Sequence, residues 1–139
     1  MRIVETTDLT AVHALRRAVF IEEQGVPEAE EWDDLDGQAV HLLALEGAAA
    51  LGTARLFVAG ETGKIGRVCV ARSARGTGLG KALIATGCDR LQALGCTRVE
   101  LGAQLQAMPF YAGLGFAAFG PVYDDAGIPH RWMARALAP

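Results

Sequence analysis

The sequence predicts a mixed α/β domain in which consecutive hairpins precede a β-α-β unit. Three observations lead to this fold class. Short apolar runs separated by glycine turns fill the first half, a helical apolar stripe runs from Leu79 to Leu94, and a glycine-rich stretch lies just before that helix. With 139 residues, 51% of them hydrophobic, the chain suffices for one domain (residues 1–139) with a substantial core.

The first half is expected to hold one helix and most of the hairpin strands. The acidic segment from Glu28 to Asp36 follows the helix breakers Gly25-Val26-Pro27 and is expected to be a loop or a short helical turn. The expected elements are, in order, a short strand at Ile3-Val4, a helix capped by Asp8 or Thr10 that runs through Phe20, and strands at Val40–Leu45, Leu51–Val58 and Ile65–Val70.

The second half is expected to alternate helices with strands. Gly95 is placed to end the first helix, and Pro109 is tolerated in the first turn of the second. The expected elements are a helix at Leu79–Leu94, a strand at Arg98–Ala103, a helix at Ala107–Leu114, and strands at Phe116–Val122 and Arg131–Leu137.

Composition excludes several classes of protein. The net charge of −3 gives no general attraction to nucleic acid. No apolar run approaches the ~18–20 residues of a membrane span, and the N-terminus lacks an apolar signal core. The three cysteines include no CxxC pair, which favours a reducing cytoplasm, and the three histidines share no metal-ligand spacing. We therefore expect a cytoplasmic protein with no metal, nucleic-acid or membrane partner.

The charges are divided unevenly along the chain. From Ala18 to Ala54 there is no Lys or Arg, whereas most basic residues lie between Arg55 and Arg98. The acidic segment is either a solubilising surface or a field that attracts a cationic ligand.

The glycine-rich loop between the strand at Ile65–Val70 and the following helix is a candidate phosphate site. Such a loop directs backbone N–H groups at one point beside the positive end of the helix dipole. Arg72, Arg75 and Lys81 add positive charge. The loop fits neither a Walker A motif, which needs Ser or Thr where Ala82 stands, nor a dinucleotide fingerprint. A plain turn that joins strand to helix is the alternative.

Motifs along most of the chain resemble, in the same order, those of a known protein family. The run from Arg75 to Gly80 resembles the acetyl-coenzyme A loop of the GNAT superfamily of N-acetyltransferases, and Phe110 to Phe116 resembles that family's Phe-Tyr-x-x-x-Gly-Phe helix. Within the superfamily the chain is most similar to the ElaA-like group. The resemblance rests further on Arg17–Phe20, Glu23-Gln24, Asp33–Asp36, His41, Ile65–Val68, Leu101–Gln104, Gly127–His130 and Met133.

The resemblance implies a GNAT fold, in which a mixed, mostly antiparallel sheet splays between its fourth and fifth strands and helices flank it. It implies direct acetyl transfer from acetyl-CoA, a co-substrate, to a small-molecule or peptide amine. The cofactor-binding residues that it implies are Val68, Cys69, Val70, Arg75, Gly76, Thr77, Gly78, Leu79, Gly80, Lys81, Gln104, Ala107, Phe110 and Tyr111. The acceptor-binding residues that it implies are Phe20, Glu23, Gln24, Arg67 and His130.

Catalytic roles follow from what this reaction needs. Tyr111 is the candidate general acid, since a phenol can donate a proton to the departing thiolate, although it could also be a core aromatic residue. The general base stays open between Glu23, His41, His130 and a water chain, because Gly66 stands where some relatives carry a glutamate. A backbone N–H of the strand at 68–70 would polarise the thioester carbonyl.

Several alternatives accompany this interpretation. Cys69 could act as a nucleophile, although nothing near it in the sequence would activate it. The protein could be an acyl-CoA-binding or sensing module without chemistry, or a phosphate-binding structural domain. Arg67 could contact substrate or pair with an acid, and a terminal strand could pair across a homodimer.

Overall fold

The computed structural model describes residues 1–138, and its centre is one seven-stranded sheet in the order β1-β2-β3-β4-β5-β7-β6. Every neighbouring pair is antiparallel except β4 and β5, which are parallel. This is the mixed, mostly antiparallel sheet that the sequence analysis expects. The strands are β1 (Arg2–Thr6), β2 (Val40–Glu46), β3 (Ala49–Ala59), β4 (Thr62–Val70), β5 (Arg98–Gln104), β6 (Ala117–Asp125) and β7 (Ile128–Ala136).

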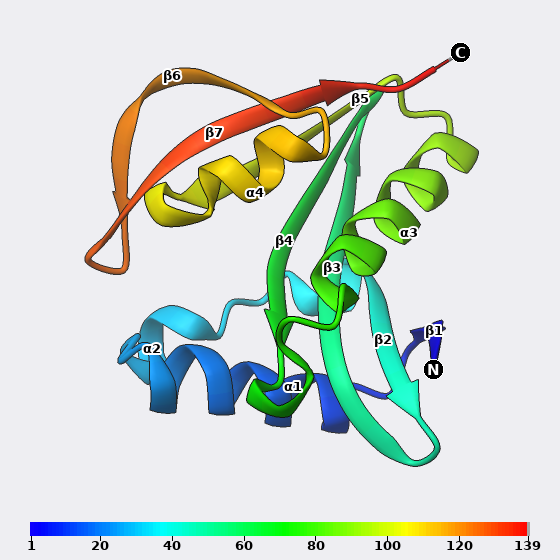
Figure 1. Cartoon of the computed structure of the whole chain (residues 1–139), viewed down its shortest axis with the longest axis vertical. Helices are drawn as coiled ribbons and strands as arrows, with labels where there is room; N and C mark the ends of the chain where they lie inside the picture. The colour runs from blue at the N-terminus through cyan, green and yellow to red at the C-terminus, as the bar shows by residue number, and fades with distance from the viewer. Residues whose placement is uncertain (139) are drawn as a thin grey trace.

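Helices flank the sheet (Figure 1). The long helix α3 (Leu79–Ala93) agrees closely with the helix predicted from the apolar stripe. The remaining helical segments are α1 (Thr10–Arg16), the π-helical η1 (Arg17–Glu23), α2 (Glu28–Glu31), η2 (Asp36–Gln38), η3 (Arg72–Ala74), η4 (Leu105–Ala107) and α4 (Met108–Gly113). The expected helix through Phe20 therefore continues to Glu23, with a change of hydrogen-bond pattern in which Gln24 N donates to Val19 O.

Strands β4 and β5 separate along their length, as Figure 1 shows. They pair only where Thr62–Lys64 lies beside Arg98–Glu100. Beyond this point β4 contains a β-bulge against β3, since Thr53 pairs with Cys69 but Arg55 pairs with Gly66. Arg67 lies in the bulge with a φ of 49°, and the bulge bends β4 away from β5. The result is a V-shaped gap in the middle of the sheet.

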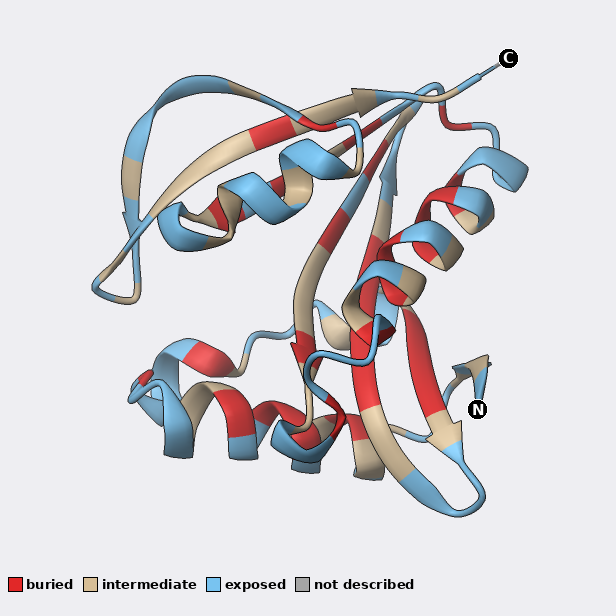
Figure 2. Ribbon diagram, in the orientation of Figure 1, coloured by how far each residue is buried: buried red, intermediate tan, exposed pale blue. Residues whose placement is uncertain are grey.

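The main core lies between α3 and the sheet. Figure 2 shows the buried residues gathered on the inner side of α3 and along the central strands. Two glycines allow a close approach there. A Cβ on Gly63 would lie 2.7 Å from Leu91, and a Cβ on Gly87 would lie 3.0 Å from Ile65. Helix α3 is thereby fixed against β3 and β4, and its first turn is held at the open end of the gap.

A smaller core lies under α1 and η1. Val12, Leu15 and Val19 pack with Leu43 and Cys69, all of them buried. These contacts attach the N-terminal helical segments to the sheet. They also place Phe20 and the acidic segment beside β3 and β4, where the cavity described below is formed.

Candidate active site

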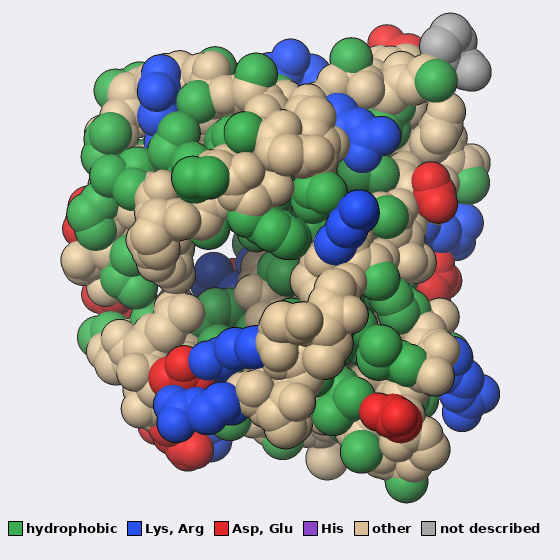
Figure 3. Space-filling model, in the orientation of Figure 1, with side chains coloured by type: hydrophobic (Ala, Val, Ile, Leu, Met, Phe, Trp, Pro, Cys, Tyr) green, Lys and Arg blue, Asp and Glu red, His purple; other side chains and the backbone are tan. Residues whose placement is uncertain are grey.

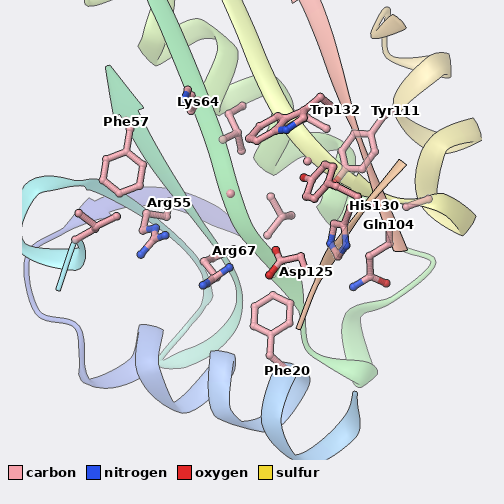
Figure 4. A pocket seen from close by; sticks show the side chains of 18 of the residues that line it. Phe20, Arg55, Phe57, Lys64, Arg67, Gln104, Tyr111, Asp125, His130 and Trp132 are labelled. Atoms are coloured by element: carbon pink, nitrogen blue, oxygen red, sulfur yellow. The ribbon is translucent and has the colours of Figure 1, made fainter. Parts of the chain in front are cut away.

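A cavity of about 700 Å³ opens beside the V-shaped gap. Figure 3 shows the surface hollowed between the β6–β7 hairpin and the part of the chain that contains α1 and α2. Figure 4 shows the cavity closely, with Phe20 on one side, Trp132 and Tyr111 on another, and Arg55 and Arg67 along the sheet. Residues from η1, η2, every strand from β3 to β7, and α4 contribute to its lining. A volume of this size suits a small organic molecule.

The glycine-rich loop lies at the end of β4. Gly76 and Gly78 both have positive φ, 77° and 86°, which L-residues with a Cβ seldom adopt. Gly78 is the residue before α3 and offers no side-chain cap, so the first N–H groups of α3 stay available to an anion. Gly80 faces two other elements, since a Cβ there would lie 3.6 Å from Phe110 Cζ and 3.9 Å from Val70 Cγ2. Loop, strand and α4 therefore meet at one place.

The structure divides the residues predicted to bind the cofactor. Val68, Gln104, Ala107 and Tyr111 line the cavity. Cys69 does not, because it points into the smaller core, where burial raises the pKa of its thiol to about 12. The remaining predicted residues lie on the loop, on the first turn of α3, or beside them, and these are Val70, Arg75, Gly76, Thr77, Gly78, Leu79, Gly80, Lys81 and Phe110.

Tyr111 lies on α4 and lines the cavity. Its ring makes edge-to-face contacts with Phe110 at 5.1 Å and Phe116 at 6.1 Å between centroids. Burial raises the pKa of its hydroxyl, so the phenol keeps its proton over a wide pH range. A protonated, partly buried phenol is suited to donate a proton rather than to accept one.

Glu23 is already engaged in an ion pair. Its two carboxylate oxygens accept hydrogen bonds from Arg75 at 2.5 and 2.7 Å. These bonds lower the pKa of Glu23, which makes it a weaker base. Among the residues that line the cavity, Glu23 is absent, although Phe20 and Gln24 on either side of it are present.

The two histidines predicted near the site differ in position. His41 is buried on β2, donates from Nε2 to Asp36 O (2.8 Å), and does not line the cavity. His130 on β7 does line it. His130 Nδ1 lies 2.7 Å from Ile128 O, and since a carbonyl can only accept, we assign the proton to Nδ1. In the neutral ring Nε2 then carries a free lone pair.

Three acids of the segment, Glu31, Asp33 and Asp36, pair with arginines beside the cavity. Arg16 contacts Glu31 and Asp36 at 2.8 Å each, and Arg55 contacts Asp33 at 2.8 Å and Asp36 at 2.9 Å. Looser contacts join Arg67 to Glu31 at 3.3 Å and to Asp33 at 3.9 Å. We call this set the arginine–carboxylate wall; its members are Arg16, Glu31, Asp33, Asp36, Arg55 and Arg67.

This pairing has electrostatic consequences. Burial alone would raise the pKa of Asp36, but hydrogen bonds from Arg16, Arg55 and His13 outweigh it and hold that pKa far below its usual range. Asp33 shows the same balance, with Arg55 as the main side-chain donor. Because these carboxylates neutralise arginines, the wall offers little net charge to attract a cationic ligand. The charge-attraction hypothesis for this part of the segment is therefore not supported.

The opposite side of the cavity combines the predicted residue His130 with Tyr123 and Trp132, which were not among the predicted site residues. Tyr123 stacks on Trp132 with a centroid distance of 5.6 Å and a tilt of 23°, and lies 5.7 Å from the ring of His130. We call Tyr123, His130 and Trp132 the aromatic wall. Asp125 and Lys64 line the cavity beside it.

A bulge in β6 explains why Tyr123 was missed. Phe119 pairs with Trp132 but Tyr123 pairs with His130, so β6 has two more residues than β7 in between. Without them Pro121 would face His130. The Gly120-Pro121 dipeptide was the available signal, since both residues favour irregular strand geometry.

Fold and cavity agree with the comparisons with known proteins. The family model for the acetyltransferase (GNAT) domain matches residues 5–137, and the chain belongs to this family. It is accordingly an acetyl-CoA-dependent N-acetyltransferase.

Individual relatives span nearly the whole chain. A Bacillus subtilis (strain 168) protein whose name marks it as an acetyltransferase is 36% identical, covering 96% of this chain and 93% of its own. Protein ElaA of Escherichia coli (strain K12) is 34% identical, covering 96% and 91%. The crystal structure of an acyl-CoA N-acyltransferase from Pseudomonas aeruginosa has a TM-score of 0.87 at 33% identity, covering 98% and 100%. The chain is thus similar to the ElaA-like group that the sequence motifs indicated.

Residues 1–138 contain neither a candidate metal site nor a helix that could span a membrane. They contain no group of three or more His, Cys, Asp or Glu side chains placed to hold a metal ion. None of their helices is long and apolar enough to cross a membrane.

Proposed function

We propose that the protein transfers the acetyl group of acetyl-CoA directly to the nitrogen of a small-molecule or peptide amine while both substrates are bound. The observation that carries the proposal is the meeting of His130, Tyr111 and the bulged part of β4 around one cavity. The proposal includes a single domain over residues 1–139 and a location in the cytoplasm. The location is supported by the cysteines, since Cys69, Cys88 and Cys96 are all free.

Acetyl-CoA would bind where the glycine loop meets β4 and α4. The first N–H groups of α3 would hold the pyrophosphate, and Arg75 and Lys81 would add charge. The pantetheine would lie along β4 in the gap that opens beyond Lys64. Because the extra residue of the bulge lacks a partner on β3, its backbone N–H is available to polarise the thioester carbonyl.

The chemistry needs one base and one acid. The amine nitrogen attacks the carbonyl carbon and forms the new C–N bond, and its proton passes to Nε2 of His130. The tetrahedral intermediate then collapses with cleavage of the C–S bond, and Tyr111 donates a proton to the departing thiolate. His130 is favoured over Glu23 and His41 because it alone of the three lines the cavity and has an unprotonated nitrogen there.

An amine acceptor is supported by one further relative. A glucosamine 6-phosphate N-acetyltransferase of Trypanosoma brucei brucei is 46% identical over 56 residues, which cover 40% of this chain. The name of that relative gives an amino sugar as its substrate. For the present chain we infer the amine and not the sugar, since the shared stretch covers less than half of the chain.

A non-catalytic acyl-CoA-binding module is the second candidate. It is favoured by one observation, the engagement of the Glu23 carboxylate by Arg75 together with a glycine at position 66. In such a protein the loop and gap would bind acyl-CoA, and no base would be required.

One paired experiment separates the candidates. Isothermal titration with acetyl-CoA measures binding, and release of free thiol over a panel of amines measures turnover. We expect binding of acetyl-CoA and amine-dependent thiol release. Binding without turnover for any amine would favour the binding module, and equal affinity for CoA and ATP would favour a phosphate-binding structural domain.

A further inference from the structure

The rings of the aromatic wall lie close together, and the backbone of β5 allows this. A Cβ on Gly102 would lie only 2.2 Å from the Tyr123 hydroxyl oxygen, so Tyr123 can lie against β5 because Gly102 has no side chain. Tyr123 and Trp132 then present nearly parallel rings. A surface of this kind packs well against a planar or apolar carbon framework.

A carboxylate stands at one end of this wall. Among the described residues that line the cavity, Asp125 is the one acidic side chain. It lies close enough to Tyr123 that, together with burial, it raises the pKa of that hydroxyl. In Figure 4 it points into the cavity between Arg67 and His130. No described cation lies within the 4.0 Å that defines an ion pair with Asp125, so the carboxylate is available to an ammonium group.

An ammonium group stands at the other end. Lys64 Nζ lies 5.8 Å from the centre of the Trp132 ring, and in Figure 4 Lys64 lies beside Trp132, away from Asp125. Arg55 and Arg67 are paired with acids in the arginine–carboxylate wall, whereas within residues 1–138 no carboxylate comes within 4.0 Å of Lys64 Nζ. Lys64 is therefore the cation of this cavity that can accept an anionic ligand.

The strand register places Lys64 and His130 at separate levels of the sheet. Lys64 faces Glu100 of β5, and His130 faces Gln104, four residues further along the same strand. At about 3.3 Å per residue these positions are roughly 13 Å apart along β5, and the two residues lie on the strands on either side of it. Lys64 Nζ lies 5.8 Å from the Trp132 ring, so the rest of the aromatic wall lies between the ammonium group and His130.

We propose that the acceptor is a primary amine on a planar or apolar framework that carries an anionic group at its far end. Asp125 binds its ammonium next to His130, the aromatic wall packs its framework, and Lys64 binds its carboxylate or phosphate-type group. The proposal rests on the proposed function, since it names the acceptor class for that same cavity.

Three acceptors with one framework test the proposal. 4-(Aminomethyl)benzoate carries the anion, 4-(aminomethyl)benzamide has nearly the same shape without it, and 4-(aminomethyl)phenylphosphonate carries a phosphate-type anion. Steady-state thiol release should give a kcat/KM for the benzoate or the phosphonate at least about tenfold above that of the benzamide, mainly through KM. The better of the two anionic compounds identifies the type of anion.

Variants assign this preference to the two residues. In Lys64→Gln the ratio between the better anionic acceptor and the benzamide should fall below about threefold, and Lys64→Arg should restore it. Arg2→Gln, which removes an exposed charge far along the sheet on β1, is the matched control and should keep the ratio. Asp125→Asn should raise KM for all three amines, whereas Asp34→Asn, an exposed acid outside the cavity, should not.

The possible failures are distinguishable. Equal kcat/KM for anionic and neutral acceptors in the wild type, or a ratio that survives in Lys64→Gln, would overturn the proposed acceptor class while leaving acetyl transfer intact. Acetyl-CoA binding without acetylation of any of the three amines would overturn the proposed function and with it this inference. Thermal unfolding of each variant shows that the changes do not come from loss of fold.

Discussion

The two sides of the cavity treat charge in opposite ways. In the arginine–carboxylate wall, cation and anion lie 2.8 to 3.9 Å apart, and the innermost pair, Arg16 with Glu31, is almost fully buried at 1% and 2% exposure. Beside the aromatic wall, Asp125 and Lys64 line the same cavity and neither forms an ion pair with any described residue.

The difference separates charges that hold the fold together from charges that are available to a ligand. The paired charges largely neutralise one another, so they fix the position of η2 and of the β4 bulge but offer little net charge to a ligand. Unpaired groups on a cavity surface can exchange water for substrate. Glu31, Asp33 and Asp36 of the acidic segment thus belong to the first kind, whereas the unpaired Lys64 and Asp125 come from β4 and the β6–β7 hairpin.

The largest expected effect comes from breaking the buried pair. Glu31→Gln leaves Arg16 in the interior with one of its two carboxylate partners removed, and we expect a loss of about 3 kcal/mol in the free energy of unfolding. Glu28→Gln is the control, because it removes an exposed pair with Arg17 and should cost less than about 1 kcal/mol. Urea denaturation measures both, and equal losses would contradict the distinction between buried and exposed pairs.

The second largest effect is expected at Tyr111, the uncharged proton donor at the cavity. Tyr111→Phe removes the hydroxyl but keeps the ring that packs on Phe110 and Phe116. We expect kcat to fall at least about tenfold, since proton donation to the thiolate is lost, while the affinity for acetyl-CoA is kept. Steady-state kinetics and isothermal titration provide the two numbers. An unchanged kcat would remove Tyr111 from the mechanism.

Acid should weaken the paired wall. The pKa of Asp36 and that of Asp33 are depressed in the folded protein, so their stabilising contribution is present above the unfolded value of about 3.9 and is lost as the pH falls below it. We expect the free energy of unfolding to fall between about pH 5 and pH 2, and to fall less in Asp36→Asn. Asp34→Asn should behave as the wild type; an equal fall in Asp36→Asn would refute this assignment.

The smallest effect is expected at Cys69. Burial raises the pKa of its thiol to about 12, and it faces the smaller core instead of the cavity. Cys69→Ala should therefore keep kcat within about twofold, because no thiolate forms there. If a stably folded Cys69→Ala protein lost most of its kcat, a covalent acetyl-enzyme route would have to be considered again.

Local patterns in the sequence were enough to predict most of the helices and strands and to locate the glycine-rich loop before α3. The apolar stripe of α3 and the glycines at 76, 78 and 80 are local signals, and their outcome depends on neighbours within a few residues. Tyr111 was predicted as the general acid from the family resemblance, and its side chain lines the cavity. The mixed, mostly antiparallel sheet and the splayed fourth and fifth strands also came from the family resemblance and were confirmed by the fold.

The acceptor side depends on contacts that the sequence does not display. Glu23 meets Arg75 across 52 positions, and Arg55 meets Asp33 across 22. The two-residue bulge in β6, which sets Tyr123 opposite His130, results from strand pairing and not from a periodic pattern. Long-range pairing and register therefore decided which charges were free, and these could be read only from the folded chain.

The central claim is that the unpaired His130 and not the paired Glu23 removes the proton from the amine. It is tested most directly by measuring kcat/KM for one acetylated amine, with the acetyl-CoA affinity of each protein, in His130→Gln and Glu23→Gln. We predict that kcat/KM falls about a hundredfold in His130→Gln, which is the lower end of the range for a general base. In Glu23→Gln we predict a fall of less than about threefold in kcat. A large loss in Glu23→Gln together with a nearly normal His130→Gln would contradict it.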